Sequence, residues 1–254
     1  MNSLLRFSPT GNFVPDPYVI VCGKTADEST QGKFWDQSRS GDPTVAAHEM
    51  IFSDDNTREM LYKELIEIGL FDLLRKVKPD AWEGLSDREG WNRLFQGDKW
   101  QEDHGIQLTQ ACNCAILWAE DTKRPSQQPT KATVRVIAEK NPSCLFNSFP
   151  DPERLTNLKL VIFLDTPSSP SKRSGGKWEP FHQVEFFDDA ELGRAYKRKG
   201  IEIISIPHPS GLSRRGMEPG NLSGSTKVGA ENALRLFEEA KATINEIMKE
   251  IEET

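Results

Sequence analysis

Short apolar runs, each followed by a polar loop, constrain the fold of this chain most. The strongest extends from Leu158 to Leu164, and β-branched residues dominate the run from Ile201 to Ile206. Two similar runs occupy residues 18–22 and 111–117. Runs this short are typical of parallel strands that are buried on both faces. The sequence therefore predicts one α/β domain over all 254 residues, a three-layer α/β/α sandwich with a central, mainly parallel four-stranded sheet.

Apolar residues at helical spacing predict helices between these runs. One helix is expected from Thr57 to about Val77, and Gly69 should break or bend it. Another begins near Asp189 and ends before Gly200, where helices commonly have a glycine. The last extends from about Val228 to Ile251, and we interpret its apolar stripe as part of the core.

The composition is that of a soluble globular protein, with 36% hydrophobic and 28% charged residues. No apolar run is long enough to span a membrane, and the first residues lack the hydrophobic region of a signal peptide. The four cysteines include a C-x-C pair without a second ligand pair, so we expect free thiols and no metal. We expect a cytoplasmic monomer without a cofactor. The net charge of −7 argues against nonspecific nucleic-acid binding but permits a local basic patch.

The stretch after the last apolar run has an unusual combination of residues. Two prolines flank His208, and because proline fixes φ and lacks an N–H donor, the strand must stop there. The imidazole is therefore expected in a stiff loop at the tip of a strand. Leu212 follows among polar residues, where no core pattern explains it, and Arg214 and Arg215 can hold phosphates. The alternative is an incidental histidine in a surface loop, but the combination favours a functional role.

Polar groups also follow the other expected strands. Gly23 opens a long polar loop that ends in an aromatic pair beginning at Phe34, and α/β folds bind ligands at such strand ends. Asn113 lies inside an apolar run, either as a buried amide that binds a ligand or as one that satisfies neighbouring backbone groups. The loop after the run from Leu158 to Leu164 includes Lys172. It is either a phosphate-contact segment or a solvated insertion.

The segment from Pro207 to Gly216 resembles the second signature of the uracil-DNA glycosylase superfamily, HPSPLS followed by a basic residue and glycine. Within HPSPLS only Gly211 departs from the signature. Asn113 resembles the asparagine with which this family reads the base. The segment from Gly23 to Glu28 occupies the place of the first signature, GQDPYH, and keeps only its glycine. The resemblance covers most of the chain in order, and its specific part is the histidine motif.

This resemblance implies a monofunctional DNA glycosylase, which flips a pyrimidine out of the helix and cleaves its N-glycosidic bond to leave an abasic site. His208 would donate a hydrogen bond to the base O2 as negative charge develops there, and Asn113 would read the base edge. Phe34 or Trp35 would stack on the base, and Leu212 would fill the gap in the helix. The remaining implied contacts are Gly23 and Lys24 to the base, and Ser210, Ser213, Arg214, Arg215, Thr166 and Lys172 to DNA.

Two departures from the family pattern concern water and substrate. Thr25 stands where the family has its water-positioning carboxylate, so Asp27 or Glu28 is the candidate replacement. Asp27 also stands where a tyrosine ordinarily blocks bulk at the pyrimidine C5, and a carboxylate can accept hydrogen bonds from hydroxyl groups. We therefore expect uracil or a 5-modified cytosine as substrate, for instance a hydroxymethylated or glucosylated base of phage DNA. The biological role would be DNA repair or antiviral defence.

Two other classes of function compete with the glycosylase reading. A catalytically weak DNA-binding member would recognise a base without excising it, and Thr25 in place of the carboxylate favours this alternative. An unrelated α/β hydrolase or nucleotide enzyme is disfavoured, because the chain has neither a G-x-S-x-G nor a P-loop pattern.

Overall fold

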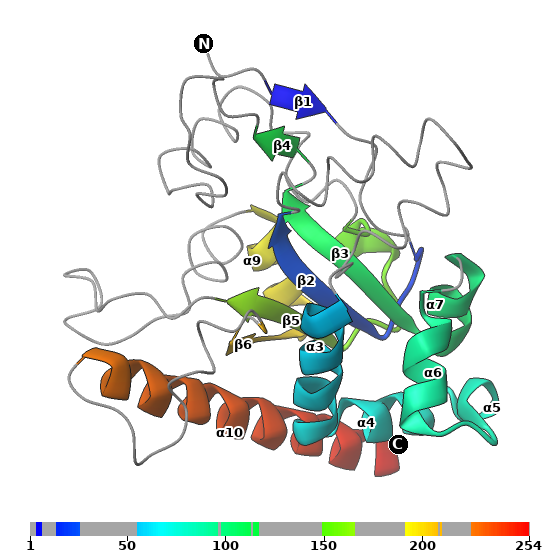
Figure 1. The fold of residues 1–254 in the computed structure, drawn as a ribbon. Coiled ribbons are helices and arrows are strands. Elements are labelled where there is room, and N and C mark those ends of the chain that lie inside the picture. Colours follow the sequence, from blue (N-terminus) through cyan, green and yellow to red (C-terminus); the bar gives the residue numbers. More distant parts are fainter. Residues whose placement is uncertain are drawn as a thin grey trace, which may run out of the picture.

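A four-stranded, all-parallel sheet forms the centre of the computed structural model, with the strand order β3-β2-β5-β6 (Figure 1). The structure describes residues 4–6, 14–25, 55–95, 98–112, 114–116, 149–165, 191–207, 209 and 225–253. The four strands are β2 (Val19–Thr25), β3 (Ile106–Cys112), β5 (Leu160–Asp165) and β6 (Glu202–Pro207). The expected α/β fold with a parallel four-stranded sheet is therefore confirmed.

One of the four expected strands was wrongly placed. The apolar run at 111–117 does not form a single core strand, because the parallel strand β3 ends at Cys112. Cys114–Ile116 forms β4, which pairs antiparallel with β1 (Leu4–Arg6) in a separate two-stranded sheet. Asn113 thus falls between two strands, and it lies outside the described residues.

The physical reason for this error is the composition of β3. Its inner residues alternate between apolar and polar, Ile106-Gln107-Leu108-Thr109, although all four are buried. The polar side chains can be buried because hydrogen bonds satisfy them. The Gln107 side-chain carbonyl, for example, accepts a hydrogen bond of 3.0 Å from the backbone N–H of Val14.

The helices follow the predicted periodicity. The long helical segment is divided into two helices by Gly69, whose φ of 81° is accessible to glycine at little cost. Gly200, with φ 73°, follows the helix before β6, as expected. The described helices are α3 (Asp55–Glu67), α4 (Leu70–Val77), α5 (Pro79–Trp82), α6 (Asp87–Arg93), α7 (Asp98–His104), α9 (Glu191–Arg198) and α10 (Ser225–Glu252), with the 3-10 helix η2 (Pro152–Arg154).

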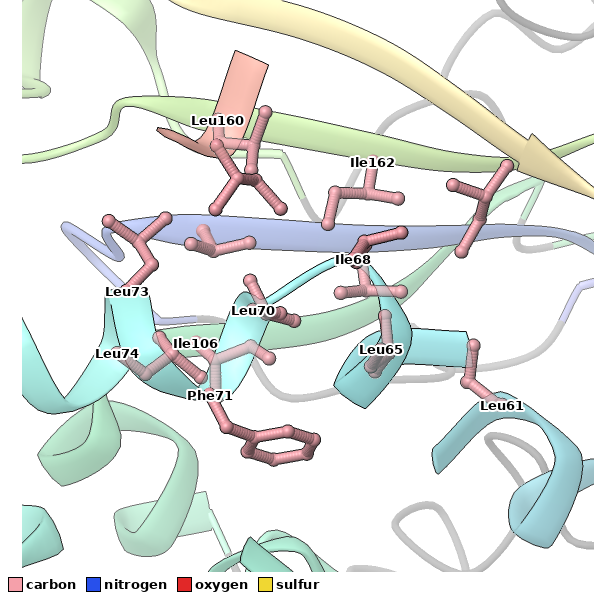
Figure 2. Close-up of a cluster of buried hydrophobic side chains, with 14 of the residues drawn as sticks. Leu61, Leu65, Ile68, Leu70, Phe71, Leu73, Leu74, Ile106, Leu160 and Ile162 are labelled. Carbon is pink, nitrogen blue, oxygen red and sulfur yellow. The ribbon is translucent and has the colours of Figure 1, made fainter. Parts of the chain in front are cut away.

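The larger apolar cluster covers one face of the sheet, here called the α10 face. Leu160 and Ile162 of β5 are buried with Leu65 of α3 and Leu70 of α4 (Figure 2). Helix α10 adds a stripe that includes Ile244, as its sequence pattern predicted. Each fully buried side chain of this size contributes about 1.5–3 kcal/mol, so this cluster dominates the stability of the sheet.

A smaller cluster covers the opposite face, here called the α9 face. Ile20 and Phe163, which alternate with the residues of the α10 face, are buried there with Tyr196 of α9. The Tyr196 hydroxyl donates a hydrogen bond of 2.7 Å to the backbone carbonyl of Pro150. Among the described residues, α9 and the short segment from Phe149 to Leu158 pack on this face of the sheet. A full third layer of helices therefore stays a prediction.

Within the described part of the chain, no helix is long and apolar enough to cross a membrane.

Candidate functional site

The carboxyl ends of the four core strands lie along one edge of the sheet. In the hydrogen-bonded register, Thr25 of β2 is opposite Cys112 of β3, and Asp165 of β5 is opposite Pro207 of β6. Parallel sheets of this type bind ligands at this edge, because the loops that follow the strands converge there. We call these strand ends the carboxyl edge.

The order of the strands places a topological switch point between β2 and β5. The chain passes from β2 to β3 on one side and then crosses to β5 on the other side of β2. The pairing of β2 with β5 ends at Cys22 opposite Phe163, although both strands continue beyond this pair. In open α/β sheets, ligands preferentially occupy the place where neighbouring connections diverge in this way.

Three of the predicted site residues lie at the end of β2. We expected Gly23 to close this strand, but the strand continues through Lys24 to Thr25, and Gly23 is a buried residue inside it. Cys22, the residue before Gly23, belongs to the apolar cluster on the α9 face.

The other predicted site residues lie outside the described part of the chain. Described residues stand immediately before four of them in the sequence: Cys112 before Asn113, Asp165 before Thr166, Pro207 before His208, and Pro209 before Ser210. The residues outside the described part are the catalytic candidates His208, Asp27 and Glu28, the base contacts Asn113 and Phe34, and the DNA contacts Leu212, Ser210, Ser213, Arg214, Arg215, Thr166 and Lys172.

Cys22 is the one cysteine whose side chain the structure describes, and it is free and buried, as expected. Burial raises the pKa of its thiol well above the usual range, so the reactive thiolate is disfavoured. The thiol instead donates a hydrogen bond of 3.2 Å to the backbone carbonyl of Gly23. Cys22 therefore supports the end of β2 by packing and is unsuited to act as a nucleophile.

The buried histidine of the described region belongs to the core and not to the carboxyl edge. His104 ends α7, just before the amino end of β3, and its ring packs edge-on against Trp82. Its Nδ1 lies 2.8 Å from the backbone carbonyl of Trp100, which can only accept, so this nitrogen carries the proton. Burial lowers the pKa of His104, which favours the neutral ring.

Sequence reasoning did not select Asp165, the last residue of β5. The signal that could have identified it is its position, because it is the first polar residue after the strongest apolar run. Among the described residues, no group of three or more His, Cys, Asp or Glu side chains is arranged to hold a metal ion.

Comparisons with models of known protein families, with curated proteins and with solved structures found no match to this chain.

Proposed function

We propose that this protein is a monofunctional DNA glycosylase that flips and excises a pyrimidine base. The observation that supports the proposal is the register at the carboxyl edge. The residues that precede the histidine motif and the phosphate-contact segment, Pro207 and Asp165, are opposite each other, and the residue that precedes Asn113 is opposite Thr25. One edge therefore gathers the ends of all four strands whose following loops contain the motifs.

The proposed chemistry requires these residue types. When the N-glycosidic bond breaks, its electron pair moves into the base, and negative charge develops on the base O2. A donor from His208 that is already in place would stabilise this charge by about 3–4 kcal/mol. Asn113 would present both a donor and an acceptor to the pyrimidine edge. Leu212 would occupy the space that the flipped base leaves, since apolar side chains inserted between base steps stabilise such distortions.

The substrate class proposed is uracil or a cytosine with a polar substituent at C5. Asp27 replaces the aromatic wall that would exclude such a group, and its carboxylate can accept hydrogen bonds from a hydroxymethyl group or a sugar. The protein would act on DNA as a cytoplasmic monomer, in repair or in defence against foreign DNA.

Base release from a panel of oligonucleotides tests this proposal. The panel contains uracil, 5-hydroxymethylcytosine and glucosylated 5-hydroxymethylcytosine, each in single-stranded and duplex DNA, and abasic sites are detected as strand breaks after alkali treatment. We expect release of at least one base, slowed about 100–1,000-fold in His208→Ala. His182→Ala is the matched control, because His182 belongs to none of the motifs, and it should retain full activity. Release of uracil alone would contradict the 5-substituent proposal, and no release at all would contradict the glycosylase.

A second candidate function is base recognition without excision. The observation that favours it is Thr25 at the end of β2, where the family pattern has a carboxylate. In that case the wild-type protein would bind DNA that contains the modified base but would produce no abasic sites from any member of the panel.

A further inference from the structure

Two arginine side chains, both partly exposed, lie over aromatic rings beside the sheet. The guanidinium carbon of Arg58, in the first turn of α3, is 4.0 Å from the ring centre of Phe95, which follows α6. The guanidinium carbon of Arg93, at the end of α6, is 5.0 Å from the ring centre of Trp100 in α7. A ring attracts the face of such a cation, whereas its five N–H donors lie in its plane. The rings can therefore position both arginines without taking up their donors.

A buried glutamine fastens the contact between Arg93 and Trp100 to the sheet. The side-chain nitrogen of Gln101 donates a hydrogen bond of 3.2 Å to the backbone carbonyl of Leu94, and its oxygen accepts one of 2.9 Å from the backbone N–H of Leu108. Leu94 directly follows Arg93 in the chain. Gln101 directly follows Trp100, and Leu108 belongs to β3, the outer strand of the sheet. One buried side chain thus joins both partners of this contact to the rigid part of the fold.

The charge of Arg93 is available to a ligand. Within the described part of the chain, Arg93 makes no ion pair. Glu89, one turn earlier on the same helix, is engaged by Ser86, which donates to it from its backbone N–H at 2.9 Å and from its hydroxyl at 2.7 Å. Arg88 gives the contrast, because it also lies over an aromatic ring but is paired with the carboxylate of Glu59. Cation–π contact alone positions Arg93, and no described carboxylate neutralises it.

Both arginines flank the carboxyl edge. Along β5, in the direction from Leu160 to Ile162, the side chain of Leu61 lies towards the carboxyl end of the strand (Figure 2). Arg58 stands almost one helical turn before Leu61, so it is closer still to this edge. On the other side, the anchoring residue Leu108 is four positions before the end of β3, about 13 Å along the strand. Because duplex DNA rises about 3.4 Å per base pair, this length corresponds to about four base pairs.

We propose that Arg58 and Arg93 form a second phosphate-contact site, which holds the DNA backbone within about four base pairs of the flipped base. This inference rests on the proposed glycosylase function and adds contacts from described helices to those expected from the loops. The planar fork of a guanidinium group matches the geometry of a phosphate. The net charge of −7 repels DNA from the molecule as a whole, so cations in fixed positions beside the site contribute strongly to affinity.

DNA binding by the double variant Arg58→Ala plus Arg93→Ala tests this site. The probe is a fluorescein-labelled duplex that contains uracil, and its dissociation constant is measured by fluorescence anisotropy over a series of salt concentrations. Phosphate contacts carry no sequence information, so this test does not depend on which base is excised. Each phosphate contact contributes about 0.9 to the slope of log K against log salt concentration, and we expect the slope to fall by about 1.8.

The matched control is Arg154→Ala plus Arg198→Ala, which removes the same charge. Both arginines are exposed, and they lie in η2 and α9, the elements that precede β5 and β6 at the opposite edge of the sheet. This control should leave the slope nearly unchanged. Thermal unfolding checks that each variant folds. If the double variant does not fold, Arg93→Ala replaces it, with an expected fall of about 0.9 that Arg93→Lys should largely restore.

The outcomes separate this inference from the glycosylase proposal. If the wild-type protein binds the duplex and the arginine variant keeps its slope, the two arginines only hold the helices together and the inference alone is overturned. If the wild-type protein binds DNA but releases no base from the panel, the glycosylase proposal fails, and the slope still decides the phosphate contacts. A wild-type protein that does not bind DNA would overturn both.

Discussion

At the scale of single residues, Asp16 joins two segments that precede core strands. Its carboxylate accepts hydrogen bonds from the backbone N–H groups of Thr156 and Asn157, each at 3.0 Å, and from the Asn157 side chain at 2.8 Å. The Thr156 hydroxyl donates a further one. Asp16 precedes β2 and the other two residues precede β5, so this group fixes the entry of both central strands. Partial burial raises the pKa of Asp16, but the hydrogen bonds from Thr156 and Asn157 together hold it below its usual value.

We predict that Asp16→Asn lowers the free energy of unfolding at pH 7 by about 1–2 kcal/mol, because charged acceptors make the stronger hydrogen bonds. The folded pKa of Asp16 is lowered, so its stabilising effect is present above the unfolded pKa of about 3.9 and is lost as pH falls through the folded value. Urea unfolding of both proteins at pH 7 and pH 3 measures this effect. Equal stabilities at pH 7, or a difference that grows towards pH 3, would show that the carboxylate is not the stabilising group.

At the scale of elements, α6 depends on a glycine that lies against a tryptophan. A methyl group at Gly90 would come within 2.1 Å of Cζ3 of Trp82, which is itself buried. Ser86 begins this helix with a capping box that includes Glu89, so the helix cannot easily shift along its axis to make room. The absence of a side chain at position 90 is therefore what lets α6 approach α5 closely.

Gly90→Ala is predicted to lower the free energy of unfolding by about 1–3 kcal/mol, the usual cost of overpacking a core. The sign of this change in the free energy of unfolding is informative, because alanine in an unobstructed helix is about 1 kcal/mol more favourable than glycine. A double-mutant cycle with Trp82→Leu, followed by thermal unfolding, isolates the contact. In the Trp82→Leu background the same substitution should cost less. A stabilising effect of Gly90→Ala in the wild-type background would mean that the two helices do not pack this closely.

The elements that the sequence predicted best are those whose residues are mostly apolar. Strands β5 and β6 are within two residues of their expected bounds, and Gly69 divides the helical segment as expected. Strand β3 was misplaced because it buries Gln107 and Thr109. Their hydrogen-bond partners become apparent only in the folded structure. Periodicity detects apolar burial, but it cannot detect polar groups that are satisfied by distant parts of the chain.

At the scale of the whole molecule, sequence alone could predict that the polar motifs follow strands but not which strands are neighbours. The order β3-β2-β5-β6 and its register bring Asp165 opposite Pro207. That juxtaposition depends on pairing between strands that are far apart in the sequence, which periodicity does not reveal. The roles of His208 and Asn113, by contrast, come from the motif resemblance and stay predictions, because both lie outside the described residues.

The overall charge of the molecule leads to the last prediction. A net charge of −7 repels DNA, so specific binding must depend on a local cluster of cations. If Arg214 and Arg215 each contact a phosphate, DNA binding should weaken with salt. The double variant Arg214→Ala plus Arg215→Ala should then reduce the slope of log K against log salt concentration by about 1.4–1.8.

The matched control is Arg235→Ala plus Lys241→Ala, because both cations lie on α10 in ion pairs with Glu239 and Glu238. It removes the same net charge and should leave the slope nearly unchanged. Equal slopes for the two double variants would mean that general charge, and not the motif, holds the DNA.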